Sequence, residues 1–111
     1  MGASAAESAE AVRAVMTEYT DAVYRADIAA LEKVFHPAAF MGGYLGDDLL
    51  LGGAAPFFAD LEGHPSMAET QAPYQAEIVS VQVDGRTAVA TVRETGFFAT
   101  TSFINHFSLL L

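Results

Sequence analysis

The second half of the chain is dominated by one signal, the pair Asp84-Gly85 between two long segments of alternating apolar and polar residues. Asp-Gly is a preferred pair in the tight turns that join antiparallel strands. The pattern therefore predicts a hairpin of strands 74–83 and 86–97, followed by a third strand over 100–111. Such a meander must bury one face, which restricts the chain to folds in which another layer covers an antiparallel sheet.

Two registers fit this hairpin. A loop of only two residues sets Val81 opposite Ala88, whereas a four-residue loop sets Val83 opposite Ala88. Both registers place the same side chains on the core face, because side chains alternate with a period of two along a strand. The residues expected on that face are Val79, Val81, Val83, Ala88, Ala90 and Val92, and the outer face carries Ile78, Val89 and Ile104.

The first half of the chain predicts helices. Apolar residues at helical spacing indicate a helix over 7–25, and Ser4 three residues before Glu7 matches a capping box. A second helix is expected from the N-cap Asp27 to Phe35, and Pro37 ends it because proline disfavours helical backbone at the preceding residue.

Between the helices and the meander the pattern is shorter. Residues 40–51 predict a short strand, a turn at Gly42, Gly43 and Gly46, and a second extended segment that Gly52 and Gly53 end. Pro56 suits the first turn of a third, short helix, and the composition of residues 63–73 predicts a loop. Helices followed by a long meander indicate an α+β fold with helices packed on one face of a curved antiparallel sheet.

Composition bounds the function. A chain of 111 residues forms one domain, taken here as residues 1–111, and 52% hydrophobic residues support a core. A formal charge of −9 argues against nucleic acids and anionic membranes as partners. There is no cysteine, and the first ten residues contain no Lys or Arg to begin a secretory signal, so a cytoplasmic protein is expected.

Several segments together resemble one family. They are Tyr19, the run Leu-Glu-Lys-Val-Phe-His-Pro at 31–37, Phe40 to Gly46, the hairpin at 81–88, and Phe-Ile-Asn-His-Phe-Ser-Leu-Leu at 103–110. In this order they resemble the NTF2-like superfamily, specifically its SnoaL-like and lumazine-binding branch. The resemblance implies a cone with a pocket at its open end, and homodimers that pair through the outer face of the sheet.

The chain departs from this family at its end. Members similar to it usually continue after the Leu-Leu strand with a glycine turn and a final strand that contains Trp, whereas this sequence ends at Leu111 and has no Trp. The final strand is therefore expected to be absent, unobserved or supplied by a neighbouring chain. An apolar strand edge left unpaired favours association.

Two polar residues, His36 and Asn105, occupy positions that suggest a role in a site. His36 lies at the exit of the second helix, where it serves either as a general base or as a cap that interacts with the helix dipole. Asn105 shares a face with Phe103, Phe107 and Leu109, the more apolar side of the last strand, so its amide must find a side chain or a ligand as partner. His106 then points outward.

Two carboxylates, Glu77 and Glu94, fall on the core face of the hairpin, opposite each other in the second register. Sharing a desolvated site would separate their pKa values, as acid–base enzymes require. The favoured interpretation instead places both in water at the frayed end of the sheet, because buried unpaired Glu is rare.

A cone of this composition would have a pocket lined mainly by aromatic side chains. The candidate pocket residues are Tyr19, His36, Phe40, Phe58, Phe103, Asn105 and Phe107. His64, Asp47 and Asp48 lack metal-ligand spacing, and no nucleotide-binding loop is present, so neither a metal nor a cofactor is expected.

Two functions fit these observations. The first is binding of a small, flat, apolar molecule, with lyase, isomerase or cyclase activity on such a substrate. The second is a non-catalytic module whose role is dimerisation. In both, the sheet is expected to form a homodimer interface.

Overall fold

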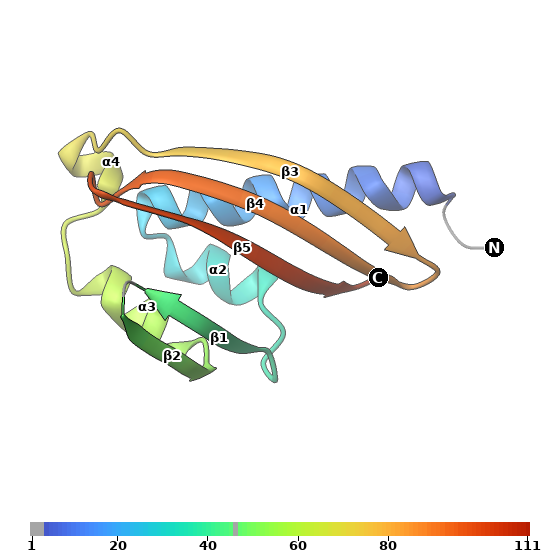
Figure 1. Cartoon of the computed structure of the whole chain (residues 1–111), viewed down its shortest axis with the longest axis horizontal. Helices are drawn as coiled ribbons and strands as arrows, with labels where there is room; N and C mark the ends of the chain where they lie inside the picture. Colours follow the sequence, from blue (N-terminus) through green and yellow to red (C-terminus); the bar gives the residue numbers. More distant parts are fainter. Residues whose placement is uncertain (1–3, 46) are drawn as a thin grey trace.

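The computed structural model describes residues 4–45 and 47–111 and confirms an α+β fold. Figure 1 shows the longest helix lying along one face of a three-stranded sheet, with a small separate hairpin at one end. The elements are α1 (Ala5–Arg25), α2 (Ile28–Val34), β1 (Phe40–Leu45), β2 (Asp48–Gly53), α3 (Ala55–Glu62), α4 (Met67–Thr70), β3 (Gln75–Asp84), β4 (Thr87–Phe97) and β5 (Thr101–Leu110).

Both predicted N-caps are confirmed. The Ser4 hydroxyl accepts a hydrogen bond from the Glu7 N–H at 3.1 Å, and the Asp27 carboxylate accepts one from the Ala30 N–H at 3.2 Å. Each satisfies a backbone donor that has no partner inside the helix. The second helix ends one residue earlier than expected, because Phe35 already has extended backbone.

The long hairpin adopts the second register, with Val83 opposite Ala88 and Asp84 opposite Thr87. Gly85 and Arg86 form the turn, and Gly85 has a φ of 60°, a left-handed conformation that glycine adopts at little cost. The core side chains expected on β4 are buried, and Val81 and Val83 pack against them.

One predicted core residue on β3 is wrong. A β-bulge between Ile78 and Ser80 shifts the register by one residue, which leaves Val79 45% exposed on the outer face. Ile78, expected outside, instead packs against the core opposite Val92. An extra residue in one strand reverses the alternation beyond it.

The last strand follows its predicted alternation. Phe103, Asn105, Phe107 and Leu109 are half-buried on the side of the helices, whereas Ile104 and His106 are exposed. Strand β5 pairs with β4 along its length, and the order of the sheet is β3-β4-β5.

Two predictions for the middle of the chain need correction. Gly42 and Gly43 lie within β1, paired with Leu51 and Leu50, so they do not form the turn, and Gly46 lies outside the described residues. The predicted loop 63–73 contains α4, whose N-cap Ser66 accepts from the Glu69 N–H at 3.1 Å. Ser66 and Glu69 repeat the spacing of Ser4 and Glu7, so the same signal identifies this helix in the sequence.

The core lies between α1 and the three-stranded sheet. Its largest fully buried apolar side chains come from α1, α2, α3, α4 and β4, and they are Val12, Val23, Leu31, Leu61, Met67 and Val92. The β1–β2 hairpin forms a sheet of its own, and Tyr44 and Leu51 on it are about 70% exposed. Among the described residues, no helix has the length and apolarity that crossing a membrane requires.

Candidate functional site

A charged side chain is buried completely in the layer between sheet and helix. Glu94 on β4 has a relative exposure of 0%. Three polar side chains from three other parts of the chain surround it: Tyr19 on α1, Tyr74 immediately before β3, and Asn105 on β5. We call these four residues the polar cluster.

Both oxygens of the Glu94 carboxylate accept a hydrogen bond. The Tyr74 hydroxyl donates to Oε1 at 2.5 Å, and Nδ2 of Asn105 donates to Oε2 at 2.7 Å. The same Asn105 nitrogen lies 3.5 Å from the hydroxyl oxygen of Tyr19. Both donors to the carboxylate are neutral, so these hydrogen bonds compensate for its removal from water.

The burial has electrostatic consequences. Loss of solvation raises the pKa of Glu94, and the hydrogen bonds from Tyr74 and Asn105 act in the opposite direction. Desolvation, followed by the nearby Glu94 charge, raises the pKa of the Tyr19 and Tyr74 hydroxyls well above their ordinary range. The cluster therefore contains a carboxyl group whose affinity for a proton is raised by burial and two hydroxyls that keep their protons.

Local sequence explains how the carboxylate reaches this position. Strand β4 alternates without interruption from Ala88 to Glu94, so Glu94 points in the same direction as Ala90 and Val92. Near the end of the strand, Gly96 has a φ of 65°, and a Cβ at this position would overlap the carbonyl oxygen of Pro73. Only glycine permits this close approach, which brings Tyr74 alongside β4.

Aromatic rings continue from the cluster toward the helices. The Tyr19 ring lies 4.9 Å from Phe107 and 6.0 Å from Phe35, measured between centroids. Phe35 in turn lies 5.4 Å from Phe58 on α3. Phe35, Phe58 and Phe107 are half-buried, so part of each ring remains accessible. We call Tyr19, Phe35, Phe58 and Phe107 the aromatic row.

The structure brings together three of the candidate site residues directly, namely Tyr19, Asn105 and Phe107. Phe58 joins them through the aromatic row. Phe103 lies across from Glu94 on β5 and packs against Phe97, with ring centroids 5.1 Å apart.

The other two candidates lie apart from this contact network. His36 is exposed, and its Nδ1 accepts a hydrogen bond from the Ala38 N–H at 2.9 Å in the turn that follows α2. Phe40 begins β1 and is 70% exposed.

The favoured interpretation of the two carboxylates is wrong for Glu94. The bulge at Val79 moves Glu77 to the outer face, where it forms an ion pair of 2.8 Å with Arg93, its cross-strand neighbour. Within the described part of the chain, Glu94 is therefore buried without a second carboxylate beside it. Sequence reasoning does not identify Tyr74, and only its place just before an alternating strand sets it apart in the sequence.

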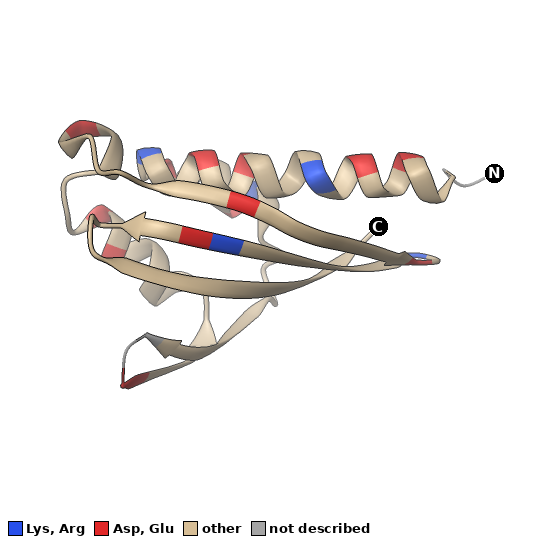
Figure 2. Cartoon of the chain, turned by 45° about the horizontal axis from the view of Figure 1, so that its top comes forward, with Lys and Arg blue, Asp and Glu red and all other residues tan. Residues whose placement is uncertain are grey.

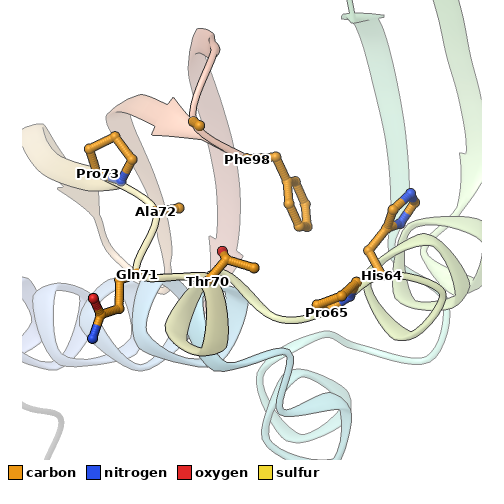
Figure 3. A pocket seen from close by; sticks show the side chains of 8 residues that line it. His64, Pro65, Thr70, Gln71, Ala72, Pro73 and Phe98 are labelled. Carbon is orange, nitrogen blue, oxygen red and sulfur yellow. The ribbon is translucent and has the colours of Figure 1, made fainter.

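A surface pocket of about 380 Å³ lies near the turn between β4 and β5. Its lining includes His64, Pro65, Pro73 and Phe98, with Thr70 and Gln71 from α4 and the residue after it (Figure 3). No member of the polar cluster lines this pocket. The polar cluster thus lies outside this pocket, and the buried carboxylate is the more informative feature because perturbed pKa values mark functional positions.

Within residues 4–45 and 47–111, no group of three or more His, Asp or Glu side chains has an arrangement that would hold a metal ion. The described cluster offers one carboxyl group, two phenol hydroxyls and one amide. These groups bind by hydrogen bonds and transfer protons.

Comparisons with known proteins place this chain in a wider group. A protein-family model described as "Putative lumazine-binding" matches residues 7–111. A comparison with curated protein sequences gave no match.

Solved structures share the fold. An NTF2-like protein of unknown function from Silicibacter pomeroyi DSS-3 is 26% identical, with a TM-score of 0.83 and coverage of 98% of this chain and 87% of its own. One from Shewanella baltica OS155 is 21% identical, with a TM-score of 0.82 and coverage of 98% and 86%. A Sinorhizobium meliloti structure described as a "putative polyketide cyclase" is 23% identical over 87% of this chain and 83% of its own, with a TM-score of 0.52.

Proposed function

This chain belongs to the "Putative lumazine-binding" family of the NTF2-like superfamily, and from that premise we propose that it binds a small, flat, largely apolar molecule against the aromatic row and the polar cluster. One observation carries the proposal. Glu94 is fully buried with neutral hydrogen-bond donors around it. A buried carboxylate reduces stability, and proteins retain such groups where they serve binding or catalysis.

The surroundings of the cluster suit such a ligand. Phe35, Phe58, Phe103 and Phe107 are half-buried, so their rings offer apolar surface that a planar molecule would cover. Small-molecule sites combine mainly apolar walls with a few polar groups that fix orientation. Asn105 lies between Phe103 and Phe107 on the inward face of β5 and provides such a group.

The proposal extends to turnover of the bound molecule by a lyase, isomerase or cyclase reaction. Glu94, which is buried and contacts Tyr74 and Asn105, would hold these two donors in place during such a reaction. The Tyr19 hydroxyl would remain protonated and donate to negative charge that develops on the substrate, while the Tyr74 O–H stays on Glu94. The Sinorhizobium meliloti structure described as a cyclase shares only the fold with this chain. At 23% identity it gives no support for a particular reaction.

The test of binding uses two neighbouring residues that point in opposite directions. A panel of flat ligands, including lumazine, flavin and anthraquinone derivatives, is titrated while the melting temperature is recorded, because a ligand that binds the native state raises it. We expect Asn105→Leu to abolish the stabilisation and His106→Leu, on the outer face, to retain it. Equal effects of the two substitutions would overturn the proposal.

A second candidate function, a dimerisation module, is favoured by the outer face of the sheet. Val79, Val89 and Ile104 are each 45–52% exposed there. Figure 2 shows acidic residues spaced along α1, whereas β5 carries no charged residue. The Glu77–Arg93 ion pair neutralises its own charges on this face. We therefore propose that a second copy of the chain pairs with it in the cytoplasm, which is compatible with a ligand on the opposite face.

A further inference from the structure

The orientation of the Asn105 amide follows from its neighbour. An ionised carboxylate only accepts hydrogen bonds, so the nitrogen of the amide, and not its oxygen, must face Glu94. The structure shows this arrangement, with Nδ2 donating to Oε2 of Glu94 at 2.7 Å and lying 3.5 Å from the Tyr19 hydroxyl. Both contacts use the nitrogen end of the amide. The oxygen end therefore points away from Glu94.

The Asn105 oxygen is left available. Among the described residues, every buried side-chain nitrogen and oxygen atom has a hydrogen-bond partner. Oδ1 of Asn105 has no hydrogen-bond partner within that part of the chain. It is therefore not a buried atom and is accessible to solvent. Asn105 is half-buried between Phe103 and Phe107, which places this acceptor beside partly exposed rings.

We propose that Oδ1 of Asn105 accepts a hydrogen bond from the ligand and that the site selects flat aromatic molecules carrying a ring N–H or a phenol O–H at one edge. Glu94 is the positioning residue, because its carboxylate fixes which end of the amide faces the ligand. This inference rests on the proposed binding function. A ligand that presents only acceptors at this edge places an acceptor against Oδ1, so no hydrogen bond forms. Polar groups left unpaired on binding are the strongest source of discrimination between similar ligands.

The substitution Glu94→Gln removes the constraint. The amide nitrogen of the introduced side chain donates where the carboxylate accepts, so Asn105 can turn its oxygen toward that nitrogen and its own nitrogen toward the ligand. The shape of the site is unchanged, since the two side chains are isosteric. Glu77→Gln is the matched control, because Glu77 lies on the outer face in an exposed ion pair.

In each of two pairs of probes, methyl groups replace the donor hydrogens. The pairs are lumazine with its N,N-dimethyl derivative, and naphthol with its methyl ether, and their affinities are measured by isothermal titration. We expect the wild type and Glu77→Gln to prefer the donor member of a pair by at least about tenfold, the value of one lost hydrogen bond. In Glu94→Gln this preference falls to about threefold or less while binding persists.

Other outcomes have distinct meanings. Equal affinity of donor and methylated probes for the wild type would overturn the inference and leave the binding function standing. The same preference in Glu94→Gln as in the wild type would show that Glu94 does not position Asn105. Binding of no probe, in these pairs and across the wider ligand panel, would overturn the proposed function and this inference with it.

Discussion

The hydroxyl of Tyr74 lies 2.5 Å from Oε1 of Glu94, although the two residues are 20 positions apart in the sequence. Tyr74 also stacks on Tyr24 near the end of α1, with ring centroids 6.0 Å apart and planes inclined by 18°. One residue therefore connects the long helix with the buried carboxylate of β4. The stability of the domain and the protonation of Glu94 should both depend on it.

Tyr74→Phe should destabilise the fold. The substitution leaves Oε1 of Glu94 without its donor, and an unsatisfied buried acceptor costs about 1–3 kcal/mol. Urea denaturation measures the change in the free energy of unfolding. Tyr24→Phe removes a hydroxyl from the stacked neighbour and should have a smaller effect. Equal losses for the two variants would show that the bond to Glu94 contributes nothing.

The buried carboxyl group also predicts a dependence of stability on pH. Because the pKa of Glu94 is raised above 4.5 by folding, the native state binds its proton more tightly than the unfolded state does. The free energy of unfolding therefore decreases as the pH rises from the unfolded pKa through the folded one, by at most about 1.4 kcal/mol per pH unit for one group.

Glu94→Gln removes this contribution. As the pH increases over that window, the free energy of unfolding of the wild type should fall relative to that of Glu94→Gln. The free energy of unfolding of Glu77→Gln should change with pH as that of the wild type does. Chemical denaturation at a series of pH values measures both. A difference between wild type and Glu94→Gln that stays constant with pH would contradict the raised pKa.

Gly96→Ala should disturb the same region through the backbone. The added Cβ would overlap the Pro73 carbonyl oxygen, and the φ of 65° is unfavourable for alanine. We expect destabilisation of at least about 1–3 kcal/mol, as for other residues forced into rare backbone conformations. Gly43→Ala is the control, since its Cβ would meet no atom within 4 Å. A melting temperature that is unchanged for Gly96→Ala would refute this account of the approach of Tyr74.

The homodimer is tested by charge placed on the outer face. Ile104 is 52% exposed there, and Ile104→Glu should convert a dimer into a monomer of 11.7 kDa in light scattering at low micromolar concentration. Ala14→Glu adds the same charge on the exposed side of α1 and should leave the dimer intact. A wild-type mass of 11.7 kDa that is independent of concentration and salt would exclude the dimer.

The regular parts of the fold follow from the sequence because they repeat. Alternation along β5 predicts the inward positions of Phe103, Asn105 and Phe107, and the same period places Glu94 on the core side of β4. Asp27 and Ser4 identify helix starts because their side chains meet a local need of the backbone.

The parts that could not be predicted depend on single irregular residues and on distant partners. The bulge at Val79 adds one residue to a strand, and no local pattern reveals which residue is the extra one. It separates Glu77 from Glu94, which alternation alone places together. The burial of Glu94 depends on donors from Tyr74 and Asn105, and their positions are known only once the strands and helices are assembled.

The decisive measurement is the position of a bound ligand relative to Phe107 and Asn105. A crystal structure of the protein with the tightest-binding member of the ligand panel measures it. We predict that the flat ligand lies against Phe107, with its polar edge within hydrogen-bonding distance of Asn105 Oδ1. A ligand seated instead in the surface pocket between His64 and Phe98, with the polar cluster unchanged, would contradict it.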